Sequence, residues 1–517
     1  MAESRLLTLP SELILACLAH LPFSDLTSCL KVGNRFLRDI ILTSVLIRYR
    51  LELERYGVEE TAALTSHLVI SDRIQELRNR EANWLNFTPR SRYTISVDFK
   101  TTSIYDLVSD VYLVGDTADP TTGLCKALKY IHTSGTETPQ WNRIDIGKPI
   151  IDFGLALEEH DLLAAVTYTP QPGNPHMHSV DVLLLSFSAG SSHRLATHPT
   201  LHLQDVELDR GRPSITIEIV GRHLAISLMY WQDEDRDNDC LYLYDWQRGV
   251  LKIVRPPLSV NTTGLVFLAV DILLVPSAAD GTLDVFRIPE SGSDALVLYS
   301  FSLPLLQPDT PMSVFQCHAA PNPRTARHTA RATFTAHPAD ALIFVSFDTG
   351  DGHFTTQQHT FVLHRASFLA AVRSLPETES SAVEWCAWGP ACTCWLDPTE
   401  RAARYITVAC GQRVVSIAPD AWHHPAPIRV LDFNQVQVNW QRTQPPQDRV
   451  RIVERDEPLR SPASFAFDEP VVSRLPYIET VSKETFDYHA VVITDDSIIG
   501  VRFDGRTVQS LEVLRFG

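Results

Sequence analysis

The sequence predicts an α+β protein of more than one domain, in which a helical N-terminal part precedes a large all-β domain. Up to about residue 86 the apolar residues recur with a helical period. After Pro89, short β-branched and aromatic runs alternate with Gly, Pro, Asp and Ser turns, as β-strands do. One strand pattern recurs seven times, which favours a seven-bladed β-propeller.

The first helical segment predicts three short helices. Pro10 suits a first helical turn, where a missing N–H costs little, and Pro22 ends the first helix. Ser24 or Asp25 can cap the second helix. The apolar stripe of the first helix consists of residues one turn apart, namely Leu9, Leu13, Cys17 and Leu21. The apolar face of the third helix consists of Phe36, Leu37, Ile40 and Ile41.

About 40 residues of helix are too small a unit to bury all these apolar faces on themselves. Either a partner protein or the remainder of the chain must therefore cover some of them. From the pattern alone, an ordinary helical subdomain packed on its own protein fits as well as a docking module.

The order and spacing of these motifs resemble the F-box. The segment has an LP-x-EL opening at Leu9, an LP-x-x-DL turn at Leu21 and a V-x-x-x-F pattern from Val32. Cys29 departs from the pattern, where the family usually has a larger apolar residue, and Gly33 and Asn34 weaken the third helix.

This resemblance implies a substrate-recognition adaptor of a Skp–cullin–F-box ubiquitin ligase, which is not itself an enzyme and needs no cofactor. Residues 5–45 would form the F-box that binds Skp and, through it, cullin. The implied contact residues are Leu9, Pro10, Leu13, Ile14, Leu18, Leu21, Leu26, Leu30, Val32 and Phe36. The sequence does not separate those that face Skp from those that face the core of the module.

Residues 46–90 predict a helical linker. Leu46, Tyr49, Leu53 and Tyr56 form one apolar stripe, and a second stripe runs from Leu68 to Leu85. The sequence from Ile47 to Trp84 resembles the linker of F-box proteins common in mushroom-forming (basidiomycete) fungi. We expect a rigid spacer, which is compatible with a helical hairpin packed on the domain that follows.

Residues 91–517 predict the β-propeller-like domain, which would bind a target protein. The repeated pattern is a polar turn followed by an apolar strand, and its copies lie about 64 residues apart on average. They begin at Asp110, Asp161, His223, Asp271, Asp340, Gln412 and Asp496. The segments 241–249 and 283–288 resemble the third strand of a propeller blade. A pair of β-sandwiches is the alternative.

Composition narrows the class of protein. The net charge of −17 lies entirely after residue 90, so an acidic β domain argues against nonspecific nucleic-acid binding. No apolar run is long enough for a membrane span. Nine scattered cysteines do not suggest a disulfide framework, so we expect an intracellular protein, cytoplasmic or nuclear.

Two clusters of residues could bind a metal ion, and an interpretation without a metal is favoured for each. Asp233, Asp235, Asp237 and Asp239 alternate like the start of a calcium loop, but Asn238 and Tyr244 replace the required Gly and Glu, which favours a solvated hairpin loop. The cysteines Cys386, Cys392, Cys394 and Cys410 precede His423 and His424. A single residue separates Cys392 from Cys394, so we expect two buried thiols on one strand face and no metal.

The rival hypothesis is a propeller hydrolase, for example a glycosidase, with an unrelated helical N-terminus. It requires carboxyl groups that gather at the centre of the β domain, about 5–10 Å apart. A third possibility is an F-box protein that acts as a scaffold without degrading its partner.

Overall fold

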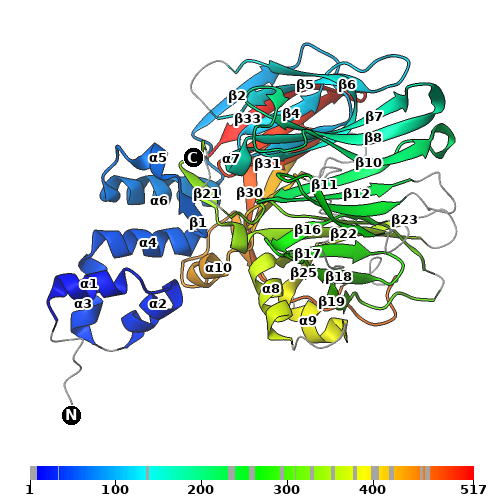
Figure 1. Ribbon diagram of the computed structural model, residues 1–517. Coiled ribbons are helices and arrows are strands. Elements are labelled where there is room, and N and C mark those ends of the chain that lie inside the picture. Colours follow the sequence, from blue (N-terminus) through cyan, green and yellow to red (C-terminus); the bar gives the residue numbers. More distant parts are fainter. Residues whose placement is uncertain are drawn as a thin grey trace.

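The structure is a computed structural model. It describes the following residues: 9–32, 34–134, 139–230, 239–255, 262–290, 296–308, 310–325, 331–350, 356–375, 381–396, 407–417, 424–454, 458–459 and 466–517. The chain is mostly β, and helices α1–α6 lie to one side of the sheets (Figure 1).

Three short helices begin the described chain: α1 (Ser11–Leu18), α2 (Phe23–Lys31) and α3 (Arg35–Thr43). Helix α2 begins directly after Pro22, whose extended backbone occupies the N-cap, so the predicted capping by Ser24 or Asp25 is wrong. Asn34 does not weaken the third helix. Its Oδ1 accepts a hydrogen bond from the N–H of Leu37 at 3.1 Å and caps α3.

The segment that follows, termed here the helical arm, consists of α4 (Val45–Tyr56), β1 (Val58–Glu60), α5 (Ala62–Thr65) and α6 (Ile70–Asn86). Gly57 ends α4 in the left-handed conformation. Strand β1 is not predicted by the sequence. It pairs antiparallel with β21 (Phe334–Ala336), almost 280 residues later, and no local pattern signals such a distant partner.

The β part is a succession of sheets of mainly antiparallel strands. The N-terminal strand β2 (Ser91–Ser96) pairs with the C-terminal strand β33 (Thr507–Arg515), so the two ends of the β part share one sheet. This sheet has the order β2-β33-β32-β31 and includes β31 (Ala490–Ile493) and β32 (Ser497–Asp504).

The next sheet contains eight strands. Its path is β10-β8-β7-β6-β5-β4-β3, and β9 (Ser191–Ser192) pairs with β8. Strand β6 (Asn142–Ala156) is long: residues 142–145 and Ile150 pair with β5, residues 150–156 pair with β7, and a register shift lies near Ile150 in each ladder. The remaining members are β3 (Tyr105–Val108), β4 (Val111–Gly115), β5 (Cys125–His132), β7 (Leu162–Gln171), β8 (Asn174–Ser186) and β10 (Thr200–Glu207).

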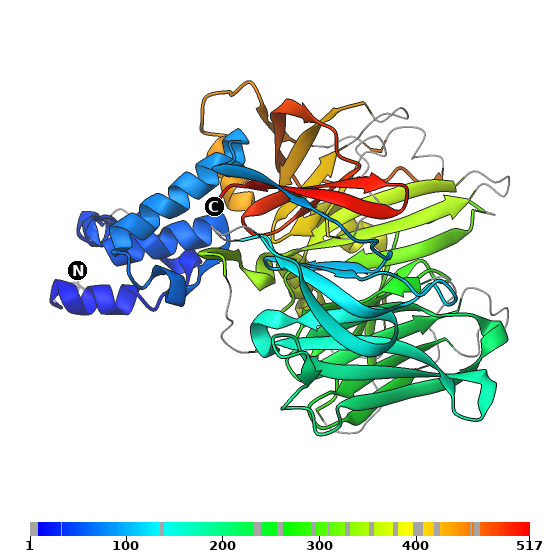
Figure 2. The ribbon, with the colours of Figure 1, turned by 90° about the horizontal axis from the view of Figure 1, so that it is seen from above.

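Four further sheets follow (Figure 2). One contains β11 (Ser214–Val220), β12 (His223–Met229), β13 (Cys240–Asp245) and β14 (Val250–Arg255). A second contains β16 (Val266–Ala269), β17 (Ile272–Ser277), β18 (Thr282–Arg287), β19 (Leu296–Ser302) and β24 (Ser381–Val383). A third contains β15 (Thr262–Gly264), β20 (Met312–His318), β22 (Leu342–Gly350), β23 (Thr356–His364) and β25 (Thr393–Trp395). The last contains β26 (Ala409–Cys410), β27 (Arg413–Ile417), β28 (Ala426–Asp432), β29 (Val450–Val453) and β30 (Tyr477–Phe486).

All seven repeats predicted from the sequence are strands: β4, β7, β12, β17, β22, β27 and β32. Each is flanked by a strand on either side in its sheet, and the two segments predicted to be third strands are β13 and β18. The prediction that residues 91–517 form a mainly β, propeller-like domain is therefore confirmed as a fold class.

Hydrophobic clusters lie between consecutive sheets, and adjacent residues of one strand serve different clusters. On β12, Leu224 and Ile226 pack in one cluster and Ala225 in the next. Because successive side chains point to opposite faces and both faces are covered, these strands are continuous apolar runs. The cluster around Val491 joins the last two sheets of the chain, and the cluster around Val492 joins the last sheet to the first strands.

Short helices interrupt the β part: α7 (Leu157–His160), η2 (Leu208–Arg210), η3 (Pro338–Asp340), α8 (Arg365–Ser374), α9 (Trp385–Cys392) and α10 (Gln435–Gln441). Cys392 ends α9, and Cys394 lies in β25. The expectation that both thiols share one strand face is therefore wrong, since a helix ends between them. No helix among the described residues is long and apolar enough to cross a membrane.

Candidate functional site

The three N-terminal helices share a small core with the start of the helical arm. Its buried members are Ile14, Leu18, Leu26, Ile40, Ile41 and Ile47. Ile47 belongs to α4, so the three helices complete their core with the helical arm. Arg50 of α4 donates hydrogen bonds to the carbonyls of Ala19 and Leu21, the latter at 3.1 Å, and so holds the turn between α1 and α2.

Half of the ten predicted contact residues face solvent. The exposed members are Leu9, Pro10, Leu13, Val32 and Phe36. Leu13, Val32 and Phe36 keep 52%, 60% and 47% of their surface accessible. Ile14, Leu18 and Leu26 are buried in the core of the module, and Leu21 and Leu30 are half-buried.

Three further apolar side chains are exposed near the turn between α3 and α4, and the sequence prediction did not include them. They are Leu42, Val45 and Leu46. Of the 17 large apolar residues exposed in the described chain, seven lie between residues 9 and 46. A concentration of exposed large apolar side chains in one short segment favours an interaction site there. We call the exposed set Leu9, Leu13, Val32 and Phe36 the N-terminal apolar face.

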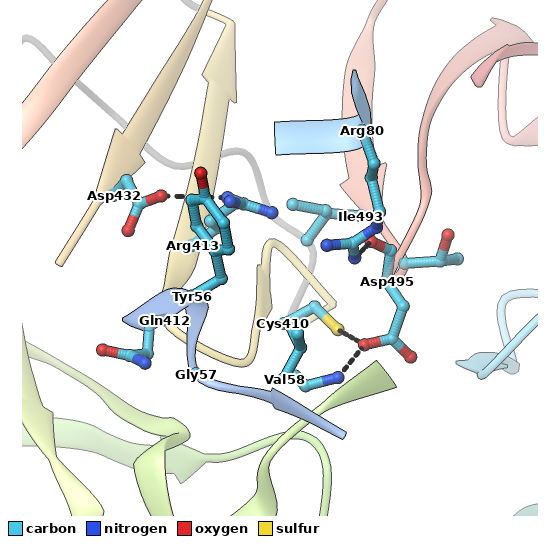
Figure 3. A pocket seen from close by; sticks show the side chains of 12 residues that line it. Tyr56, Gly57, Val58, Arg80, Cys410, Gln412, Arg413, Asp432, Ile493 and Asp495 are labelled. Carbon is cyan, nitrogen blue, oxygen red and sulfur yellow. Dashed lines mark hydrogen bonds and ion pairs between the residues drawn. The ribbon is translucent and has the colours of Figure 1, made fainter. Parts of the chain in front are cut away.

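A small pocket lies where the helical arm meets the β part (Figure 3). Ion pairs line it: Arg413 Nε lies 3.1 Å from Asp432 Oδ2, and Arg413 also pairs with Glu81. Asp495 Oδ1 accepts a hydrogen bond from the backbone N–H of Ala336 at 2.6 Å.

Electrostatics in this pocket favour a structural role. Burial by itself lowers the pKa of Arg413, but Glu81 and Asp432 outweigh it and raise the pKa above its usual value. Burial, assisted by the charge of Glu158, raises the pKa of Asp495 to about 6. The space has room for about one water molecule and is too small for an organic ligand.

Three half-buried carboxyl groups on strands β3, β6 and β11, those of Asp106, Asp152 and Glu218, influence one another electrostatically and form a second polar cluster in the β part. Burial raises the pKa of Asp106 to about 6, of Asp152 to about 7 and of Glu218 to about 8, and the charge of Asp106 raises the latter two further. Asn322 Nδ2 donates a hydrogen bond to Glu218 Oε2 at 2.5 Å, and His318 Nδ1 lies 3.9 Å from Glu218 Oε1. A raised carboxyl pKa is typical of a general acid, so this cluster is the one that bears on the hydrolase hypothesis.

The other residues considered as metal ligands do not form a common site among the described residues. Cys386 is exposed, Cys392 and Cys410 are half-buried, and Cys394 is buried. Within the described residues, no group of three or more His, Cys, Asp or Glu side chains could hold a metal ion. Asp233, Asp235, Asp237 and His423 lie outside the described residues. Asp239 is buried, and its Oδ1 accepts a hydrogen bond from the N–H of Tyr230 at 2.5 Å.

No protein-family model and no curated protein sequence matches this chain. It is similar to the WD40 domain of SCAP from fission yeast at 9% identity, over 82% of this chain and 94% of that one, with a TM-score of 0.35. The C-terminal WD40 domain of Sif2 matches at 10% identity, over 82% and 98%, with a TM-score of 0.31. A luciferin-regenerating enzyme matches at 8% identity, over 78% and 100%, with a TM-score of 0.28. The strand order itself, rather than these superpositions, supports the propeller-like description.

Proposed function

We propose that this protein is a substrate-recognition adaptor of a Skp–cullin–F-box ubiquitin ligase. In this proposal the three N-terminal helices are an F-box of the type common in basidiomycete fungi. The N-terminal apolar face docks on Skp, the β part binds a target protein, and other subunits transfer ubiquitin. The observation that carries the proposal is the exposure of Leu13, Val32 and Phe36, three large apolar side chains at motif positions that resemble the F-box.

The chemistry of such an adaptor is proximity. Two macromolecules held on one rigid body meet at an effective concentration far above that in solution, so no residue of this chain needs to perform a reaction. Target specificity would then lie in the loops of the β part, because loops carry most variation and most binding residues. The protein would act in the cytoplasm or the nucleus, in keeping with its nine scattered cysteines.

The β part is proposed to be a seven-bladed propeller. The long strand β6 can be counted in two blades, since its first half pairs with β5 and its second half with β7. Each of the seven repeated strands would then be the second strand of one blade. The pairing of β2 with β33 would close the ring between its two ends.

The test is co-purification of the full chain with recombinant Skp. Leu13→Asp combined with Val32→Asp places charges on the N-terminal apolar face without touching its core, and we expect this variant to lose the complex. Leu208→Asp combined with Val250→Asp is the matched control, since both residues are exposed in the β part. The proposal fails if folded wild-type protein forms no complex, or if both double variants bind equally well.

A propeller hydrolase is the second candidate, and the carboxyl cluster of Asp106, Asp152 and Glu218 is the observation that favours it. A glycosidase of this kind would use one protonated and one ionised carboxyl group. It predicts hydrolysis of a glycoside substrate by the purified chain, and loss of that activity in Glu218→Gln. The adaptor proposal predicts no such activity. The scaffold hypothesis predicts that deletion of residues 1–45 leaves the level of the bound target unchanged, and accumulation of the target would argue against it.

A further inference from the structure

We infer that the helical arm and the β part form one cooperative unit, and that Arg413 is a positioning residue of this unit whose contacts contribute to the direction of the three N-terminal helices. This inference deepens the proposed function, because an adaptor must present its target at a fixed angle to the ligase. It is testable without Skp, so its outcome is independent of whether Skp binds.

The first attachment is an aromatic cluster between α6 and the C-terminal segment. Trp84 stacks on Phe516, and Phe87 meets Phe516 edge-on with ring centroids 5.4 Å apart. Asn83 Nδ2 donates a hydrogen bond to the carbonyl of Phe516 at 3.0 Å. Trp84 and Phe87 therefore belong to the same hydrophobic cluster as the last two sheets.

The second attachment is centred on Arg413, the first residue of β27. Its guanidinium pairs with Glu81 of α6 and with Asp432 of β28, and it lies over the ring of Trp84, 4.9 Å from the centroid. One side chain thus contacts two positions on the arm and one on the β part. Arg413 Nε donates to Asp432 of β28, and Nη2 donates to Glu81 of α6. A rotation of α6 that carries Glu81 and Trp84 away from β28 therefore breaks at least one of these contacts.

The third attachment is the pairing of β1 with β21. Val58 pairs with Ala336, and Glu60 pairs with Phe334. The ring of Phe334 enters the hydrophobic cluster between α4 and α6, which includes Leu77. Arg324 Nη2 adds an ion pair to Glu59 Oε2 at 3.1 Å.

The fourth attachment is at the C-terminus of α4. Asn434, which caps α10, donates a hydrogen bond from Nδ2 to the carbonyl of Arg55 at 3.0 Å. The guanidinium of Arg55 lies over the ring of Trp440, 4.1 Å from its centroid. Attachments at several separate places cannot all persist if the arm turns as a free linker. The three N-terminal helices share a core with Ile47 of α4, so their direction follows that of the arm.

Hydrogen exchange of the full-length protein, followed by mass spectrometry, tests this inference. In the wild type we expect the amides of α6 to exchange as slowly as those of β27 and β33, since one cooperative unit opens as a whole. In Arg413→Met, α6 should exchange at least tenfold faster, while β12 and β13 are unchanged. Arg413→Lys should restore part of the protection, because lysine keeps the positive charge but lacks the planar set of N–H donors of the guanidinium group.

Arg429→Met is the matched control, because Arg429 pairs with Glu479 inside the same sheet. It should leave exchange in α6 unchanged. Small-angle scattering gives a second readout: Arg413→Met should broaden the distribution of interatomic distances, and Arg429→Met should not. The inference is overturned if wild-type α6 exchanges much faster than β27 and β33. It is also overturned if both Met variants affect α6 equally.

Discussion

The indole ring of Trp84 stacks on the ring of Phe516, with centroids 4.1 Å apart and an interplanar angle of 18°. These residues are more than 400 positions apart in the sequence, and they join the helical arm to the C-terminal end of the last sheet. Stacked aromatic pairs of this kind add to the free energy of burial. The contact makes the stability of the β part depend on a helix that precedes it.

Truncation of Trp84 should therefore destabilise the whole protein. Trp84→Ala removes a buried indole and leaves a cavity beside Phe516, and we expect a loss of about 3–5 kcal/mol in the free energy of unfolding. Urea denaturation followed by circular dichroism measures it. Trp440→Ala is the control, since this indole is 48% exposed and its loss should cost less than about 1 kcal/mol. Equal effects of the two changes would contradict the proposed packing.

Gly57→Ala should destabilise more than Gly281→Ala. Both glycines have a left-handed backbone, with φ of +63° and +62°, so each substitution costs about 1–2 kcal/mol of strain. A methyl group at Gly57 also forces the side-chain amide of Gln412 to move, which adds a small cost, whereas one at Gly281 meets nothing within 4 Å. Thermal unfolding of the two variants gives the comparison. A larger loss of stability in Gly281→Ala would contradict the close packing described where the helical arm meets the β part.

Glu218 should make the protein less stable as pH rises. Burial raises the pKa of its carboxyl group to about 8, whereas in the unfolded chain it lies near its ordinary value of 4.5. The folded state therefore holds the proton more tightly, and this stabilisation is lost between about pH 4.5 and pH 8. Glu218→Gln should remove that loss and raise stability at pH 8.5 by about 1–3 kcal/mol. Urea denaturation of the wild type and of Glu218→Gln at pH 5.5 and pH 8.5 measures this difference. An equal stabilisation by Glu218→Gln at the two pH values would contradict the prediction.

Leu18 and Leu13 separate the two roles of the N-terminal helices. Leu18→Ala should cost about 2–5 kcal/mol of the stability of this helical module, because its side chain is buried with Ile41. Leu13→Ala should change stability by less than about 0.5 kcal/mol, because its side chain faces solvent. Local hydrogen exchange of α1 and α3 measures both. If Leu13→Ala destabilises as much as Leu18→Ala, Leu13 is a core residue and the apolar face is wrongly assigned.

Local signals in the sequence predicted most of the β part. Runs such as Ile272–Leu274 predict a strand buried on both faces, and the structure places β17 there with residues in two clusters. The pairing of β1 with β21 was not predictable, because strand partners that are distant in sequence leave no local trace. The helix ending at Cys392 was also missed, since the cysteine spacing alone suggested one strand.

The candidate site was predicted as a set of residues but not as a surface. Leu13 belongs to the predicted apolar stripe and Ile14 lies beside it, and only the packing of α3 shows that Ile14 is buried and Leu13 exposed. Leu42, Val45 and Leu46 lie outside the motif and were missed. The sequence feature that could have indicated them is a group of three large apolar residues around Ser44, which is more than the core of so small a module can bury.

The measurement that tests the adaptor proposal most directly is the alkylation of two exposed thiols with and without recombinant Skp. Cys17 lies one helical turn after Leu13 on α1, and Cys386 lies on α9 in the β part; both are exposed. We expect an excess of Skp to slow the modification of Cys17 at least tenfold and to leave Cys386 unchanged, as counted by mass spectrometry of the full chain. Unchanged modification of Cys17 at a saturating concentration of Skp would contradict docking at the N-terminal apolar face.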